Sequence, residues 1–311
     1  MKYVQLGESN VQASTVALGV MRMDSKSRTE AGHIVETAIE THINFFDTAD
    51  CYHAGESSRK LGQALKDTGV DRRSVFVQTK VGIVRDHNDA IARYDFSQHH
   101  LTEAVDQELD NLQSDYIDFL LLHRPDTLVN LEELAQTFHE MESSGKVRHF
   151  GVSNVNPMQI EMLQSAVEQK LEVNQLQFGL GHTSMLQQEF HVNMGDDSSL
   201  DRDGGLISYS RLKHMSIQAW SPFQYGFFEG VFLDNPQFPE LNAKLDDLAS
   251  KYGVSTSAIA VAWILRHPAG FQVLLGSMNP ERIRQMAAGA DLELSAQEWY
   301  ELYTAAGNKL P

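Results

Sequence analysis

Cysteine is nearly missing from this sequence, and acidic side chains far outnumber basic ones. The 311 residues include a single cysteine, Cys51, so no disulfide can form within the chain, and such usage favours a reducing compartment. The 42 acidic residues against 25 lysines and arginines give a formal charge of −17. A field of that sign repels phosphate backbones and anionic lipid, so we expect no nucleic-acid or membrane-surface function.

Long apolar runs are also absent. No stretch approaches the roughly 18 consecutive apolar residues of a membrane span, and the opening MKYVQLGESN lacks the apolar segment of a signal peptide. We therefore expect a cytoplasmic protein with no membrane span. The hydrophobic fraction of 42% is ample for a large core, and the charged fraction of 22% is ordinary for a globular domain.

Short apolar runs alternate with longer amphipathic segments through most of the chain. Runs rich in Val, Ile, Leu and Phe suit strands buried on both faces, and they lie at residues 15–19, 44–47, 74–80, 116–123, 147–153, 174–178, 216–220 and 271–276. Helices are predicted between strands, as at residues 27–42, 97–112, 130–145 and 240–253. Eight such strand-then-helix units predict an α/β fold, the (β/α)8 TIM barrel, with a doubly wound sheet as the alternative. We expect one domain over residues 1–311.

Two segments fall outside this rhythm. The opening KYVQLGESNVQAS alternates around a polar GESN turn, which predicts a β-hairpin that plugs one mouth of the barrel. The closing SAQEWYELYTAA places Trp299, Leu302 and Tyr303 at helical spacing, which predicts an extra C-terminal helix.

Polar side chains follow three consecutive predicted strands. Asp47 ends the second strand, Lys80 ends the third and His123 ends the fourth, while Tyr52 lies in the loop that leaves the second. The carboxyl ends of barrel strands share one face, where catalytic groups gather. Each residue alone has a structural alternative, such as a helix cap for Asp47 or a buried core position for His123, but the four together favour a catalytic site.

These four residue types suit proton transfer to a carbonyl oxygen. An ammonium near Tyr52 stabilises the phenolate and lowers its pKa, and Lys80 is the expected cation. Asp47 would keep Lys80 charged, and His123 would orient the carbonyl oxygen. No side chain can supply a hydride, so a nicotinamide cofactor is the expected donor.

The sequence resembles the aldo-keto reductase family along essentially its whole length, and in particular a bacterial, monomeric branch of uncharacterised cytosolic oxidoreductases. The resemblance is carried by NFFDTADCYHAGESSRKLGQAL (44–65), VFVQTKVG (75–82), DYIDFLLLHRPD (115–126), SGKVRHFGVSN (144–154), EVNQLQF (172–178), AWSPF (219–223) and LLGSMNPERIRQ (274–285). It implies NADPH-dependent reduction of small aldehydes and ketones. The tetrad of the family, an Asp, a Tyr, a Lys and a His, falls on Asp47, Tyr52, Lys80 and His123.

No G-x-G-x-x-G follows a predicted strand, which argues against a Rossmann domain. The resemblance instead implies that NADP(H) would bind extended across the mouth of the barrel. The nicotinamide would meet the carboxamide-binding residues Ser153, Asn154 and Gln175 and the ring of Trp220, and the pyrophosphate would follow Ser221 and Phe223. The adenosine end would meet Gly276, Ser277, Met278, Arg282 and Gln285. Arg282 favours NADPH because a guanidinium matches phosphate geometry, whereas Gly276 stands where many relatives carry a lysine, which leaves NADH use open.

The expected substrate pocket is soft and apolar, with a wall of Met21, Met23, Phe223, Tyr225 and Phe227. Arg124 stands where many relatives have an aromatic residue. Either it contacts an anionic group of the substrate, or it makes a solvated surface ion pair. Cys51 is interpreted as a small buried hydrophobe rather than a redox sensor, because no resolving thiol exists.

Two other functions deserve comparison. A metal-dependent barrel hydrolase is disfavoured, because the sequence has no H-x-H or H-E-x-x-H, and we expect no metal cofactor. A catalytically silent module that binds NADP(H) for regulation or sensing would keep the fold. The intact tetrad disfavours it, because a sensor has no evident need for an activated phenol.

Overall fold

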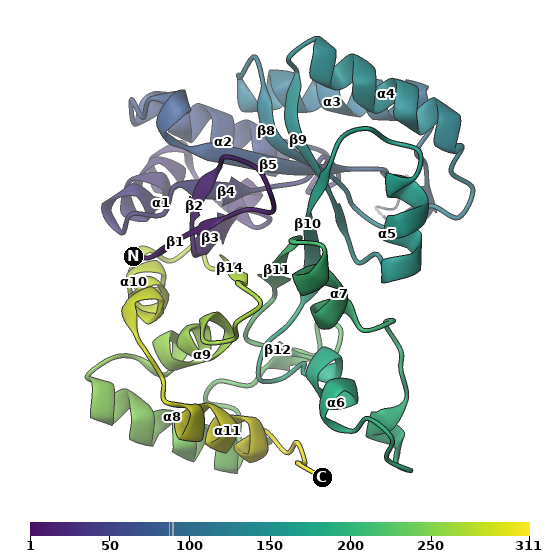
Figure 1. The fold of residues 1–311 in the computed structure, drawn as a ribbon. Coiled ribbons are helices and arrows are strands. Elements are labelled where there is room, and N and C mark those ends of the chain that lie inside the picture. Colours follow the sequence, from purple (N-terminus) through teal and green to yellow (C-terminus); the bar gives the residue numbers. More distant parts are fainter. Residues whose placement is uncertain (87, 89) are drawn as a thin grey trace.

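Eight parallel strands close into a barrel in the computed structural model, which describes residues 1–86, 88 and 90–311 (Figure 1). The barrel strands are β3 (Val16–Gly19), β4 (Phe45–Asp47), β5 (Phe76–Val81), β8 (Ile117–Leu122), β9 (Val147–Ser153), β10 (Leu171–Gln177), β11 (Ser216–Trp220) and β14 (Gln272–Leu275). They pair in chain order, and β14 closes the ring on β3. The TIM barrel is confirmed. The predicted strand bounds differ from the observed ones by at most two residues, except at the strand predicted at 174–178, since β10 begins at Leu171.

Helices surround the barrel, and their ends carry clear sequence signals. They are α1 (Arg28–Glu40), α2 (Glu56–Asp67), α3 (Gln98–Leu112), α4 (Leu131–Ser143), α5 (Pro157–Gln164), α6 (Ser184–Phe190), α7 (Leu206–Leu212), α8 (Pro239–Tyr252), α9 (Thr256–Leu265), α10 (Pro280–Ala287) and α11 (Ala296–Ala305). Ser27 and Glu30 form a capping box at the start of α1, and Ser295 and Glu298 form another at α11. The predicted C-terminal helix is therefore confirmed.

The helix α9 was missed by the sequence analysis. Seven of its residues, from Ala258 to Ile264, are buried, so it has no polar face and no amphipathic period to mark it. It packs between the barrel and the outer helix α8, which the sequence analysis had taken as a simple connecting helix. Among the described helices none is long and apolar enough to cross a membrane alone, and only α8 and α9 together, across a 92° bend, reach that length and composition.

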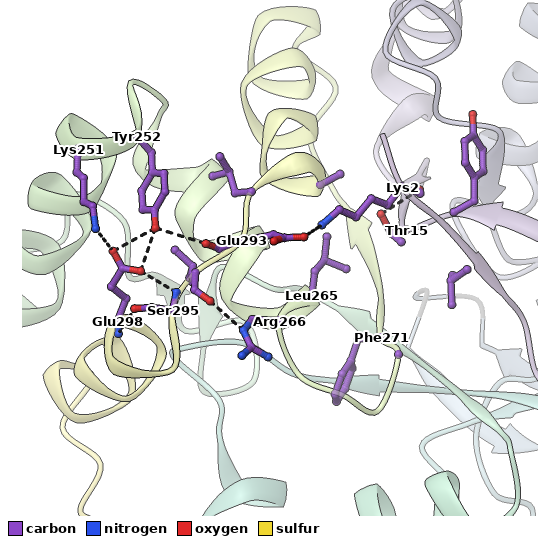
Figure 2. Close-up of a pocket in the computed structure, with 16 residues that line it drawn as sticks. Lys2, Thr15, Lys251, Tyr252, Leu265, Arg266, Phe271, Glu293, Ser295 and Glu298 are labelled. Atoms are coloured by element: carbon purple, nitrogen blue, oxygen red, sulfur yellow. Dashed lines mark hydrogen bonds and ion pairs between the residues drawn. The ribbon is translucent and has the colours of Figure 1, made fainter.

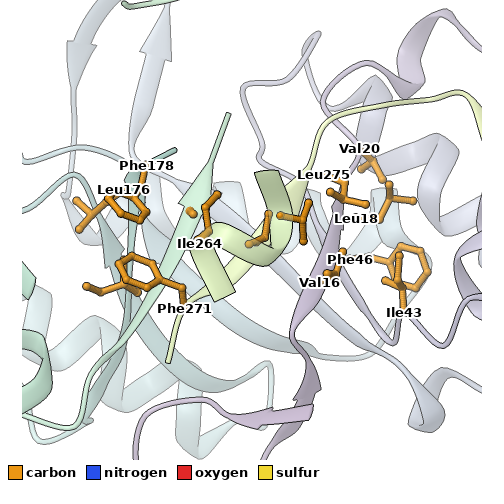
Figure 3. Close-up of a cluster of buried hydrophobic side chains, with 14 of the residues drawn as sticks. Val16, Leu18, Val20, Ile43, Phe46, Leu176, Phe178, Ile264, Phe271 and Leu275 are labelled. Atoms are coloured by element: carbon orange, nitrogen blue, oxygen red, sulfur yellow. The ribbon is translucent and has the colours of Figure 1, made fainter. Parts of the chain in front are cut away.

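The main hydrophobic core lies between the strands and the helices (Figure 3). Alternate residues of each strand point outward, so Val16, Leu18 and Phe46 pack against helices, while Ala17 and Phe45 point into the barrel. In the same core Phe178 stacks on Phe271, which directly precedes β14, with ring centroids 4.6 Å apart.

The opening hairpin closes the amino-terminal end of the barrel, as predicted. Its strands β1 (Tyr3–Gln5) and β2 (Gln12–Ser14) are antiparallel, and Leu6, Val11 and Ala13 pack on the inward-facing Phe45 and Phe119. Because this end is filled, access to the barrel interior is left to the carboxyl ends of the strands. Two further hairpins, β6 (Ile83–Arg85) with β7 (Ile91–Tyr94) and β12 (Gln224–Tyr225) with β13 (Gly230–Val231), rise from loops at that end.

Candidate active site

The four predicted strand-end residues converge. Lys80 Nζ donates a hydrogen bond to Asp47 Oδ1 over 2.8 Å and a second to the Thr48 carbonyl oxygen over 2.7 Å. The same nitrogen lies 3.4 Å from the Tyr52 hydroxyl oxygen. The His123 ring meets the Tyr52 ring edge to face, with centroids 5.8 Å apart. Residues 76 positions apart in the sequence thus form one cluster at the carboxyl ends of β4, β5 and β8.

The charges of the cluster are arranged around a buried ion pair. Lys80 is fully buried, and although burial alone would lower its pKa, Asp47 and Tyr52 raise the pKa above its ordinary value. Burial raises the pKa of the Tyr52 hydroxyl, and Lys80 opposes this shift without cancelling it. Lys80 therefore lowers the pKa of Tyr52 as expected, but desolvation of the phenolate is the larger effect and the pKa stays above its ordinary value.

His123 is neutral in this environment. Burial, followed by the nearby charges of Lys80 and Arg124, holds the pKa of His123 well below its ordinary value. Its Nδ1 lies 3.6 Å from the sulfur of Cys51, which leaves Nε2 for another partner. A neutral imidazole with a free Nε2 can donate a hydrogen bond to a substrate oxygen.

Four glutamines form an amide network one layer below Lys80, and the sequence analysis missed three of them. Gln78 and Gln175 each donate from Nε2 to Asp47 Oδ2, over 2.6 and 2.9 Å. Gln218 Nε2 donates to the side-chain oxygens of Gln78 and Gln272 over 3.1 and 2.8 Å. The only sequence signal was a glutamine within each of the strands β5, β10, β11 and β14, and β10 carries a second one, Gln177. The level that the four network glutamines share emerges only when the barrel closes.

A cavity of about 210 Å³ opens above the cluster, and we call it the strand-end cavity. Its lining includes twelve predicted site residues, namely Asp47, Tyr52, His123, Arg124, Ser153, Asn154, Gln175, Trp220, Ser221, Gly276, Met21 and Phe227. Ile83, Arg85 and Ile91 of the β6–β7 hairpin also line it, although the sequence analysis gave this hairpin no role. Trp220 Nε1 donates to Asn154 Oδ1 over 3.2 Å.

A second cavity of about 510 Å³ adjoins the first beside α10, and we call it the α10 cavity. The two share Met21, Ser221, Phe228 and Gly276 in their walls, so they form one elongated groove. The α10 cavity contains the predicted residues Phe223, Ser277, Arg282 and Gln285. Asn154 and Ser221 hold left-handed backbone conformations (φ 59° and 47°) along this groove, and such strained positions cluster at functional sites.

Three of the predicted cofactor and substrate residues line neither cavity in this structure. Met23 is fully buried in the main core, because the short 3-10 helix Met23–Ser25 turns its side chain inward. Tyr225 packs on Phe238 with ring centroids 5.0 Å apart and lines neither cavity. Met278 packs against the main core and lines neither cavity.

Another cavity, of about 710 Å³, lies away from the tetrad (Figure 2). Lys2 pairs there with Glu293, and the Glu298 carboxylate accepts hydrogen bonds from Lys251 and Tyr252. These charged groups already satisfy one another, so size alone does not make this cavity the reactive site.

Arg124 makes no ion pair with any residue in the described part of the chain, which contradicts the surface ion-pair alternative. Its guanidinium lies 6.0 Å from the centroid of the Trp220 ring, and burial lowers its pKa. A half-buried cation thus faces the strand-end cavity beside His123.

Known proteins resemble this chain over nearly its full length. The model of the Aldo/keto reductase family matches residues 15–306. The 6-dehydroglucose reductase of Agrobacterium fabrum is 32% identical over 307 residues, which cover 96% of each chain. The uncharacterized oxidoreductase YcsN of Bacillus subtilis is 32% identical over 313 residues, or 98% of each chain. An aldo-keto reductase from Klebsiella pneumoniae, crystallised in complex with NADPH, superposes with a TM-score of 0.79 at 22% identity, covering 100% of this chain and 96% of the other, and supports the fold.

Proposed function

This chain belongs to the aldo/keto reductase family, and from that premise we propose that it reduces aldehydes and ketones to alcohols with NADPH, the proton coming from Tyr52. The observation that carries the proposal is the contact of 3.4 Å between the Tyr52 hydroxyl and Lys80 Nζ, at the wall of an open cavity. The two relatives named as reductase and oxidoreductase support the same reaction class.

Each member of the tetrad has one task. As negative charge develops on the substrate oxygen, the Tyr52 hydroxyl transfers its proton to that oxygen. Lys80 stabilises the tyrosinate left behind, and Asp47 holds the ammonium of Lys80 in place. The raised pKa of Tyr52 keeps the proton on the phenol until the substrate oxygen becomes the stronger base. His123 Nε2 orients the carbonyl oxygen.

The elongated groove fits an extended dinucleotide. The guanidinium of Arg282 has no side-chain partner among the described residues, so it is available for a phosphate. Nothing lies within 4 Å of the position where a Cβ on Gly276 would be, so the backbone there can be approached closely. We propose that Arg282, Ser277 and Gln285 hold the adenosine end, and that Ser153, Asn154 and Trp220 hold the nicotinamide. When bound, the reduced nicotinamide supplies the hydride.

The substrate is a small molecule that enters between Met21, Phe227 and the β6–β7 hairpin. Two relatives are named 6-dehydroglucose reductase. The substrates to be assayed therefore include a hydroxylated aldehyde as well as aromatic aldehydes and keto acids.

We further propose that the chain acts as a cytoplasmic monomer. Light scattering of the purified protein at its assay concentration checks the monomer, with a dimer mass as the contrary result.

The test is to mix the chain with NADPH and an activated aromatic aldehyde and to follow the nicotinamide absorbance. We expect turnover in the parent and a loss of about 10²–10⁴-fold in Tyr52→Phe, the usual contribution of a general acid. Tyr3→Phe, at an exposed tyrosine, is the matched control and should keep full activity. Tight NADPH binding without turnover of any carbonyl would favour the silent sensor module instead.

A further inference from the structure

Three metal-ligand side chains meet beside the tetrad. One ligand atom each from Asp50, Cys51 and His123 lies within 4.8 Å of the others. Asp50 and Cys51 lie in the turn after β4, and His123 follows β8, so two separate segments form the cluster. No spacing motif marks it, because the ligands stand at positions 50, 51 and 123 of the sequence.

One carboxylate oxygen of Asp50 supplies an acceptor that has no partner. This atom, Oδ1, is buried and accepts no hydrogen bond from any residue that the structure describes. The backbone nitrogen and the thiol of Cys51 donate hydrogen bonds to the same carboxylate, so a single oxygen is left open. The nearest ammonium, Lys80, is already committed to Asp47, Thr48 and Tyr52. The open oxygen is a buried acceptor that a cation can satisfy.

Cys51 and His123 complete a donor set of oxygen, sulfur and nitrogen. Their side chains are 7% and 8% exposed and line the strand-end cavity, so an ion and a water can reach them from solvent. The depressed pKa of His123 leaves its imidazole neutral and ready to ligate. Burial, with a contribution from Asp50, raises the pKa of the Cys51 thiol to about 12, which an ion has to overcome by displacing the proton.

We propose that Asp50, Cys51 and His123 bind one Zn²⁺-class divalent cation, with a water from the cavity as fourth ligand, and that the bound ion inhibits the reductase. Mixed carboxylate, thiolate and imidazole ligation with one open position suits Zn²⁺. On binding, the Cys51 S–H bond breaks, a sulfur–metal bond forms and the proton leaves to solvent, with no change of oxidation state. The carboxylate and thiolate charges balance the dication, so the occupied site adds no net positive charge beside Arg85 and Lys80.

Binding is tested directly, without turnover. The parent chain is titrated with ZnCl₂ by calorimetry and with CoCl₂ by absorption, where a thiolate ligand gives a sulfur-to-cobalt charge-transfer band. We expect one ion per chain in the parent. Cys51→Ala and Asp50→Asn should each weaken binding by about tenfold or more, and Cys51→Ala should lose the charge-transfer band.

The control variant is His99→Ala. It removes an exposed histidine of α3 that also lies beside a carboxylate, because His99 is 3.5 Å from Glu103. This variant should bind as the parent does. The proposal is overturned if Cys51→Ala binds as tightly as the parent, if no charge-transfer band forms, or if His99→Ala removes the titration. Circular dichroism of each variant verifies folding, and Cys51→Ser, close in volume, replaces Cys51→Ala if that variant unfolds.

The inhibition of turnover by bound Zn²⁺ rests on the proposed function, and it is measured separately from binding. Zn²⁺ should lower the turnover of the parent reversibly, with recovery on chelation, because the ion engages His123 at the cavity wall. Turnover of Cys51→Ala should not respond to the same Zn²⁺ addition. If the parent binds Zn²⁺ but reduces no carbonyl, the binding site stands and the proposed function fails. If turnover is normal but no Zn²⁺ binds, the binding site fails alone.

Discussion

At the scale of single residues, the site depends on a charge pair buried inside the barrel. Lys80 is fully buried, and Asp47 is 3% exposed. Both carboxylate oxygens of Asp47 accept hydrogen bonds. Oδ1 accepts from Lys80, and Oδ2 accepts from the side-chain amides of two glutamines. Such a pair stabilises little relative to an apolar core, but removal of one partner leaves an uncompensated charge. Under the proposed function, its role is to support the chemistry of Tyr52.

Lys80→Met tests this pair. We expect a loss of about 3–5 kcal/mol in the free energy of unfolding, because the Asp47 carboxylate is left buried without its cation. The double variant with Asp47→Asn should recover part of that stability, since the uncompensated charge is gone, but not the turnover. Urea denaturation and the aldehyde assay measure the two effects. A stable single variant, or an active double variant, contradicts the assigned roles.

Arg124 is the second residue with a separable effect. Because its half-buried guanidinium faces the cavity without an ion-pair partner in the described chain, we expect a preference for carbonyl substrates that carry a carboxylate. Arg124→Ala should lower kcat/KM for a keto acid by about tenfold or more and change the value for its ester little, as expected for one lost charged hydrogen bond. Equal losses for acid and ester would show a general packing role.

At the scale of elements, α10 and the loop before it connect the two cavities. Pro280 occupies the first turn, and Asn279 caps the helix by accepting from the Arg282 backbone nitrogen. The helix start is thereby fixed, and the side chains of Arg282 and Gln285 are presented to the α10 cavity. The helix N-terminus adds a favourable field for a phosphate.

Arg282→Ala should raise the KM for NADPH by roughly 10–100-fold, since a hydrogen bond to a charged group contributes about 1.5–3 kcal/mol. The KM for NADH, which lacks the 2′-phosphate, should change far less. Steady-state kinetics with both cofactors give the comparison. Arg284→Ala is the matched control, because Arg284 lies on the same helix but pairs with Glu40. Equal effects on both cofactors refute the role of Arg282.

At the scale of the whole molecule, burial favours the neutral form of several histidines. Burial lowers the pKa values of His100, His149, His182 and His267, and that of His267 falls to about 4. In the unfolded chain these imidazoles are protonated as the pH falls through their ordinary pKa. In the folded chain they are protonated only at a lower pH. Stability must therefore fall as the pH drops below the ordinary histidine range.

His267 provides the test of this pH dependence. Its folded pKa of about 4 lies below the ordinary value of 6.5, so the stability it contributes is complete above pH 6.5 and is lost as the pH falls toward 4. His267→Gln should make the decline in this window shallower, by at most about 1.4 kcal/mol per pH unit for one proton. Urea midpoints measured across the window, with the exposed His33→Gln as control, provide the measurement. An unchanged slope in His267→Gln would argue against a buried neutral His267.

Much of this protein followed from sequence alone. The apolar runs at strand spacing predicted the barrel, because strands covered by helices must be apolar on both faces. Asp47, Lys80 and His123 could be placed at one rim, since parallel strands all end on the same face. The hairpin and the C-terminal helix also followed from local patterns.

Only the tertiary structure decided what surrounds those residues. The level shared by Gln78, Gln175, Gln218 and Gln272 depends on strand register around a closed ring, and the approach of Cys51 to His123 depends on how two loops pack. Side chains in the short connections that follow barrel strands, such as Met23 and Tyr225, turn inward or aside for the same reason. Local sequence sets strand and helix periods, but a loop takes its conformation from its neighbours, because few backbone hydrogen bonds of its own hold it.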